Sequence, residues 1–168
     1  LVAMVSILAE EKEKGTLRVL LTADVKAAEY LTGVGSYVWA ACMLGSLVFM
    51  ATGGYKGTEA LFFLAVMGIG IFISLVFGAA IGVACRNQMA ATAVSVPVML
   101  VLSFLPMLSS FNKTLEKMAK FVYTQQVSLL VNPAADKLID MGNIGIILIN
   151  IFIVTAFFGY AYQKSAFD

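Results

Sequence analysis

The distribution of charge along the chain constrains its fold more than any other feature. Asp, Glu, Lys and Arg are absent from four long stretches, residues 30–55, 60–85, 87–112 and 141–163. A helix needs about 20 apolar residues to cross the hydrocarbon core of a bilayer, which is roughly 30 Å thick. Each stretch is long enough, so the sequence predicts four complete membrane spans.

Composition supports the same class of protein. Hydrophobic residues make up 61% of the 168 residues and charged residues only 12%, against roughly 45–50% and about 25% in soluble domains. The alternative, a buried helical core of a large soluble protein, would require polar faces at helical spacing, and these segments are apolar around most of their circumference. We therefore expect an all-α, polytopic helical bundle in a lipid bilayer, with residues 1–168 forming a single transmembrane domain.

The expected boundaries follow from the charges and turn residues. The predicted spans are residues 29–52, 59–85, 89–108 and 143–162. Residues 1–9 are apolar but have no basic segment before them, so they resemble the end of a preceding span in a truncated chain rather than a signal peptide. Pro97 and Pro106 are each predicted to bend or break the third span locally.

The connection over residues 109–142 holds much of the remaining charge. Its residues Leu115, Met118, Ala119 and Val122 recur at helical spacing, which predicts a short amphipathic helix at the membrane interface. After the break at Asn132-Pro133, residues 134–142 favour a second short helix that ends at Gly142.

The most densely charged run lies at residues 10–14, within a loop that covers residues 10–28. Glu10 and Lys14 can pair at i, i+4, Gly15 can end the preceding helix, and Thr16 can cap a new one. Leucines then line one face of a two-turn helix that could dock into a groove on a soluble partner; they are Leu17, Leu20 and Leu21. An interfacial helix on lipid and a polar loop without a special role remain open alternatives.

Small residues recur at every fourth position of the second predicted span. They are Gly70, Ser74, Gly78 and Gly82. Such a face lets another helix approach closely, either within the subunit or in a second copy. Ala41 and Gly45 repeat the spacing once in the preceding span. The alternative is that glycine is simply common in membrane helices, but three consecutive repeats of the spacing favour an interface.

Several kinds of chemistry have no basis in the sequence. Proton and ion relays need ionisable residues inside the membrane, and the predicted spans contain no His and no charged residue except Glu29 and Glu59 at their first positions. Cys42 and Cys85 form no metal-binding or disulfide pattern, and no basic cluster indicates a nucleic-acid partner. The phosphate-binding motif with a Gly-Lys pair is also absent. If the protein transports a substrate, its energy must come from another chain.

The run EKEKGTLRVLLTADVKAAEYLTG, residues 11–33, resembles the cytoplasmic loop of ABC-2 type transporter permeases. The elements that carry the resemblance are Glu11, Glu13, Gly15, Thr16, Leu17, Leu20, Leu21 and Glu29. The order of hairpin, short loop, proline-bearing span, helical connection and final span is similar as well. Two departures are the lack of the family's first span and most of its second, and Thr22-Ala23-Asp24 where the family often has a proline.

This resemblance implies the membrane subunit of an ATP-binding cassette exporter in the cell membrane. Two permease copies would pair with two ATPase subunits, which hold ATP and Mg²⁺, while this chain holds no cofactor and no catalytic site. Residues 10–28 would be cytoplasmic, with a coupling helix within residues 10–22 that contacts the ATPase, and residues 109–142 would lie outside. The Lys and Arg count supports this orientation only slightly.

Three other functions compete with that of an exporter permease. A non-transporting membrane scaffold would use the small-residue face and the outer helices for assembly. An ion-coupled carrier is disfavoured because the spans lack charge. An intramembrane enzyme is disfavoured because no acid–base pair lies at membrane depth.

Overall fold

The computed structural model describes residues 1–15, 27–131 and 141–166. These residues are helical apart from short turns, and the described part of the chain contains no strand, which confirms the predicted all-α class. The helices are α1 (Val2–Lys14), α3 (Ala27–Thr52), α4 (Thr58–Ala84), α5 (Gln88–Ser109), α6 (Lys113–Ala119), α7 (Tyr123–Val131) and α8 (Met141–Ala166).

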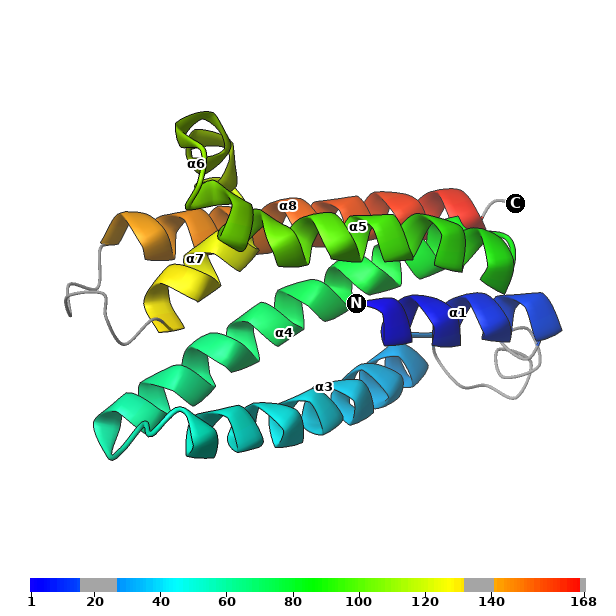
Figure 1. The fold of residues 1–168 in the computed structure, drawn as a ribbon. Coiled ribbons are helices and arrows are strands. Elements are labelled where there is room, and N and C mark those ends of the chain that lie inside the picture. The colour runs from blue at the N-terminus through cyan, green and yellow to red at the C-terminus, as the bar shows by residue number, and fades with distance from the viewer. Residues whose placement is uncertain (16–26, 132–140, 167–168) are drawn as a thin grey trace.

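Helix α4 is the centre of the bundle. It packs against α1, α3, α7 and α8, and α1 lies beside both α4 and α5 (Figure 1). The buried apolar side chains accordingly gather along α4 and the faces turned toward it, as Ile73, Ala80 and Val5 illustrate. Because α4 is the most apolar of the long helices, the central position buries the side chains that gain most from leaving water or lipid headgroups.

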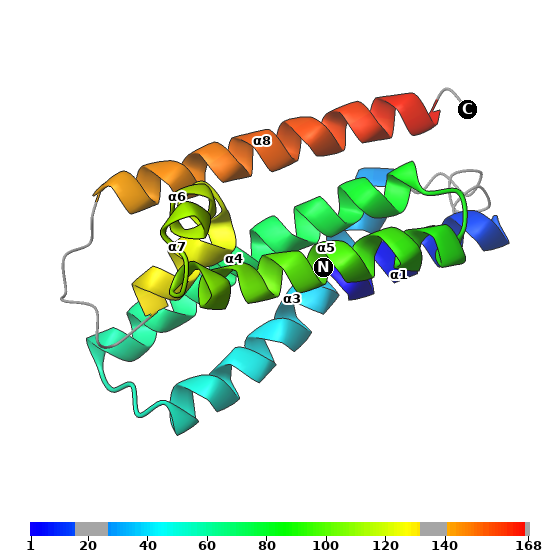
Figure 2. The ribbon, with the colours of Figure 1, turned by 45° about the horizontal axis from the view of Figure 1, so that its top comes forward.

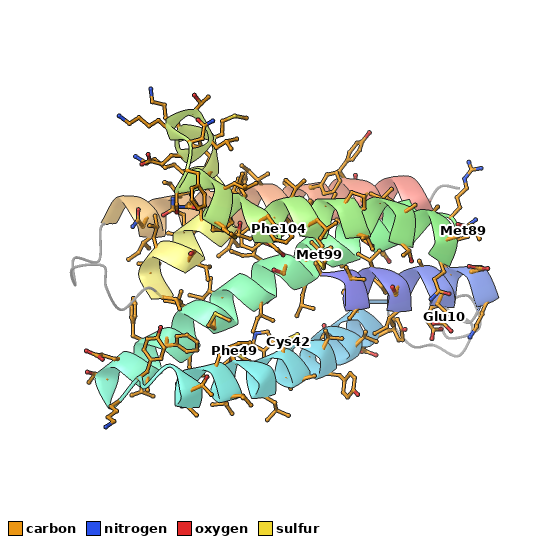
Figure 3. The ribbon with its side chains drawn as sticks, in the orientation of Figure 1. Glu10, Cys42, Phe49, Met89, Met99 and Phe104 are labelled. Carbon is orange, nitrogen blue, oxygen red and sulfur yellow. The ribbon has the colours of Figure 1, made fainter. Side chains whose placement is uncertain are left out.

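Four helices, α3, α4, α5 and α8, are long and apolar enough to cross a membrane. Large apolar side chains stay exposed along them, for example Phe49, Phe104 and Phe152, which are 69%, 52% and 76% exposed. Figure 3 shows Phe49 and Phe104 along the length of the bundle and Glu10 at one end. An apolar surface of this extent requires lipid or a protein partner around it, as in a multi-pass membrane protein.

The two ends of the bundle differ in what they contain. One end holds the last turn of α1, the turn 85–87 between α4 and α5, and the end of α8 (Figures 1 and 2). The opposite end holds the start of α8 and the turn 53–57 between α3 and α4. Gly54 and Gly57 adopt φ of 73° and 58°, which a residue with a side chain rarely tolerates, so they allow this tight hairpin.

Helix α5 runs unbroken through both prolines, so of the predicted bend or break, a break does not occur at Pro97 or Pro106. A proline removes one backbone hydrogen bond, and in an apolar setting the remaining bonds hold the helix because an open backbone would have no water to bind. Near the end of α5, Ser109 donates its hydroxyl to the Pro106 carbonyl at 2.7 Å, which satisfies one of the last free acceptors.

The connection after α5 differs in detail from the prediction. Helix α6 ends at Ala119 and α7 starts at Tyr123, where one helix over 115–122 and a later one were expected. Ala119 is buried in the bundle and Met118 is 64% exposed. The helix expected to end at Gly142 lies mostly outside the described residues, and its end is wrong because Gly142 lies inside α8. The apolar run that follows carries the helix through this glycine.

Candidate coupling end and helix interface

The charged end of α1 forms as its residue types predict. Lys14 donates to Glu10 at 2.5 Å, and this hydrogen bond, with the Glu10 charge, raises the pKa of Lys14. Gly15 ends the helix with a φ of 69°, and its N–H donates to the Lys12 carbonyl at 3.3 Å. Since the Glu10–Lys14 pair is exposed, it adds little to stability. Its sequence position matters more, because it marks where the chain leaves the bundle.

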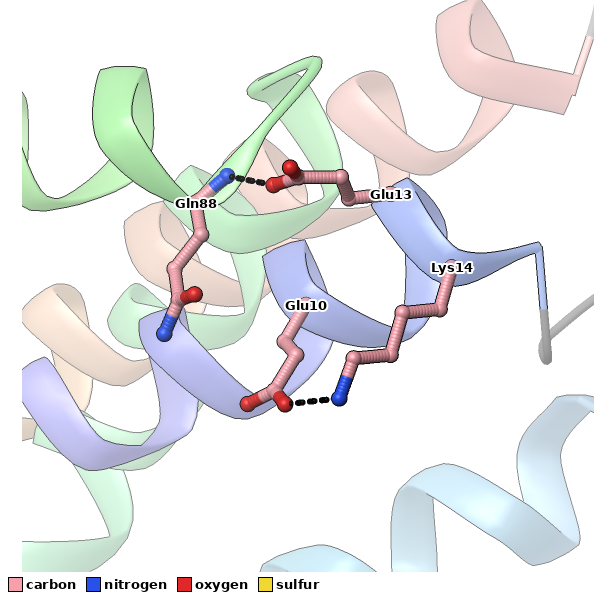
Figure 4. A network of polar contacts seen from close by, with 4 residues as sticks. All are labelled: Glu10, Glu13, Lys14 and Gln88. Carbon is pink, nitrogen blue, oxygen red and sulfur yellow. Dashed lines mark hydrogen bonds and ion pairs between the residues drawn. The ribbon is translucent and has the colours of Figure 1, made fainter.

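Two neighbouring charges of the same helix bind the turn between α4 and α5. Lys12 Nζ donates to the Val83 carbonyl at 3.0 Å, in the last turn of α4. Glu13 Oε2 accepts from the Gln88 N–H at 2.8 Å, at the first residue of α5 (Figure 4). Each charge complements the dipole of the helix end that it meets, and each such contact contributes about 0.3–1 kcal/mol. Glu13, which the family resemblance assigns to the ATPase contact, thus has a partner inside the chain.

The other residues of the predicted partner surface are only partly described. Glu11 lies half-buried on α1, and Glu29 lies exposed in the first turn of α3, where an acidic side chain suits the helix dipole. Thr16, Leu17, Leu20 and Leu21 lie outside the described residues.

The C-terminal half of the small-residue face on α4, Gly78 and Gly82, contacts α1. A Cβ on Gly82 would lie 3.0 Å from Leu8 Cβ and 3.1 Å from the Val5 carbonyl oxygen. A Cβ on Gly78 would lie 2.7 Å from the Leu1 carbonyl oxygen. Helix α1 therefore approaches α4 at backbone distance, which only glycine at these positions permits.

The N-terminal half of the same face, Gly70 and Ser74, contacts α7. A Cβ on Gly70 would lie 2.9 Å from Val127 Cγ2, and the Ser74 hydroxyl lies 2.8 Å from the Tyr123 hydroxyl. All four predicted residues therefore contact other helices of the same chain. By contrast, Gly45 faces open space, and Ala41 is exposed.

A group of polar contacts that the sequence analysis missed fixes α6 and α7 to the bundle. The Ser109 hydroxyl also lies 3.0 Å from Gln125 Oε1, and both side chains are buried. Asn150 of α8 donates to the Phe121 carbonyl at 2.9 Å. At the far end of α7, the Tyr55 hydroxyl donates to the Val131 carbonyl at 2.8 Å. The signal available was Asn150 itself, an amide in the middle of an apolar span, where polar groups usually bind across helices.

Replacing Tyr123 with phenylalanine tests this anchoring. The Ser74 hydroxyl keeps its bond to the Gly70 carbonyl at 2.9 Å, so only one hydrogen bond is lost. We expect the free energy of unfolding to fall by about 0.5–1.5 kcal/mol, seen as a melting temperature lower by roughly 2–5 °C in detergent. The control Tyr37→Phe alters a tyrosine that is 74% exposed and should leave the melting temperature unchanged. Equal melting of both variants would contradict the anchoring role.

A cavity of about 270 Å³ lies between α1, α3, α4 and α7. Its lining is mostly apolar and includes Cys42, Met67 and the hydroxyl pair of Ser74 and Tyr123. No Asp, Glu, Lys or Arg lines it, and among the described residues no group of His, Cys, Asp or Glu could hold a metal ion.

Comparison with known proteins agrees with this arrangement. Residues 1–160 match the family model described as ABC-2 family transporter protein. The chain belongs to this family, a family of membrane components of ABC transporters. Searches of curated proteins and of solved structures returned no match.

Proposed function

We propose that this chain is the permease subunit of an ATP-driven ABC exporter. It forms the translocation pathway and couples to separate ATPase subunits through residues 10–22. The family match over residues 1–160 is the observation that carries the proposal. Two features of the sequence support it: the spans hold no charged residue for ion coupling, and the chain has no phosphate-binding Gly-Lys motif of its own.

The arrangement of the ends supports an orientation for this permease. Residues 10–28, the turn 85–87 and the end of α8 belong to the cytoplasmic face of the cell membrane, and the connection 109–142 belongs to the outer face. The end of α1, the turn 85–87 and the end of α8 lie at one end of the bundle (Figure 1), as one cytoplasmic surface would require. Pairing with a second permease copy completes the proposed assembly, with ATP and Mg²⁺ bound on the ATPase subunits.

Co-purification tests the proposal directly. The natural chain, tagged and expressed with ATP-binding cassette ATPases encoded beside it, should retain one of them through purification in mild detergent. ATP hydrolysis by the purified complex should exceed that of the ATPase alone. A multi-pass membrane protein of another family, tagged in the same way, is the control. Failure to retain any ATPase, together with capture of unrelated membrane proteins, would instead support the scaffold function.

A further inference from the structure

Two contacts join the end of α1 to the turn between α4 and α5, one made by a positively charged side chain and the other by a negatively charged one. Lys12 and Glu13 are consecutive residues, yet Lys12 reaches a carbonyl in the last turn of α4 and Glu13 reaches the first N–H of α5. Last-turn carbonyls and first-turn N–H groups lack partners inside their own helices, so both contacts satisfy groups that would otherwise need water. We call these two contacts the α1 clamp.

The turn that the α1 clamp holds is too short to move by itself. Only residues 85–87 separate the two helices, and Asn87 already caps α5 by accepting from the Ala90 N–H at 2.8 Å. Burial raises the pKa of the Cys85 thiol, and the nearby Lys12 ammonium partly offsets this effect. Fixing Val83 and Gln88 therefore fixes the whole turn and the ends of both helices.

Close packing behind the α1 clamp prevents α1 from rotating away from its partners. Gly82 brings Val5 and Leu8 against α4 at backbone distance. Val5 and Ala9 are fully buried and share a cluster with Ala91 of α5. Helix α1 is thus held against α4 and α5 along its length. It is also clamped near its end by Lys12 and Glu13, just before Gly15 and the loop that follows.

We infer that Lys12 and Glu13 are positioning residues that make the end of α1 and the α4–α5 turn move as one body. This inference rests on the proposed function, in which the loop over residues 10–22 receives the motion of the ATPase. A displacement of that loop is then passed through the α1 clamp to α4 and α5 together. Glu13 acts by holding α5 and needs no contact with the ATPase.

Reversible cross-linking tests the inference in the reconstituted permease–ATPase complex. Glu13→Cys and Gln88→Cys are combined in a chain that carries Cys42→Ser and Cys85→Ser. Without cross-linking, transport per ATP hydrolysed should fall by up to about fivefold, because one terminal contact is lost. A short methanethiosulfonate cross-linker should restore transport per ATP hydrolysed, and reductant should lower it again. The control pair Lys113→Cys and Lys117→Cys lies within the single helix α6, outside residues 10–22, so cross-linking it should change nothing.

Several outcomes would overturn the inference. The first two are full transport by the double-cysteine variant before cross-linking and no increase in its transport after cross-linking. The other two are a loss of transport on cross-linking that reductant reverses, and failure of the cross-link to form. The last two would mean that the end of α1 and the turn separate during the cycle or are never adjacent. Glu13→Gln provides a variant without cysteine: its amide oxygen still accepts from Gln88, so it should transport better than Glu13→Ala at equal ATPase association.

The wild-type complex separates this inference from the proposed function. If the wild-type chain neither binds an ATPase nor transports on ATP addition, the proposed function fails. If the wild type transports and the cross-linked variant does not, the proposed function stands and the α1 clamp is refuted.

Discussion

Replacing Leu20 and Leu21 together with aspartate is expected to uncouple the permease from its ATPase. Burying a leucine side chain contributes about 1.5–3 kcal/mol, and a carboxylate buried in the same groove would add a desolvation cost. ATPase activity stimulated by the permease, and transport, should therefore fall by roughly tenfold or more. The spans should still insert, because the substitutions lie in the loop between α1 and α3.

Val19→Asp is the matched control for this substitution. Helical periodicity places Val19 on the face opposite Leu17, Leu20 and Leu21, so an aspartate there should leave coupling within about twofold of wild type. Both variants are measured in proteoliposomes at equal permease content. Equal transport by the double aspartate variant and the wild type would reject residues 10–22 as the ATPase contact.

Replacing Gly82 with leucine is expected to have the largest effect on the fold itself. The new Cβ would begin 3.0 Å from Leu8 Cβ and 3.1 Å from the Val5 carbonyl, and the rest of the side chain would have no space. Overpacking of this kind costs about 1–3 kcal/mol or more. Because α1 would be displaced, the α1 clamp should also open, and transport should be lost along with thermal stability.

A glycine that faces open space provides the comparison. A Cβ on Gly159 of α8 would meet nothing within 4 Å, and leucine favours a helix over glycine by about 0.8–1 kcal/mol. Gly159→Leu should therefore melt at or above the wild-type temperature, while Gly82→Leu melts several degrees lower. Equal melting temperatures for the two variants would show that α1 does not pack on Gly82.

The long helices were predictable because one physical requirement dominates them. A membrane span tolerates almost no charge, so the charge-free stretches show directly where α3, α4, α5 and α8 lie. Proline is a weaker signal in this setting. The prediction of a break at Pro97 applied a rule for helices in water, whereas an apolar environment penalises an open backbone more strongly.

The contacts of the candidate site were less predictable because they join distant parts of the chain. Spacing identified Gly70 and Gly82 as members of one face, but it left open whether that face meets the same subunit or another. The partners, α7 and α1, lie on either side of α4 in the sequence. The roles of Lys12 and Glu13 were likewise hidden, because a charged run by itself indicates exposure to water and says nothing about which helix ends lie beside it.

The α1 clamp also has a consequence for the biogenesis of the protein. Lys12 and Val83 are separated by 71 residues, and Glu13 and Gln88 by 75. The ribosome must therefore complete α3 and nearly all of α4 before the Lys12 contact can form, and reach the start of α5 before the Glu13 contact can form. Until then, the charges at the end of α1 have no turn to bind, and in the proposed orientation the lysines would help to keep this loop on the cytoplasmic side. The same side chains would first orient the α3–α4 hairpin and only afterwards join it to α1.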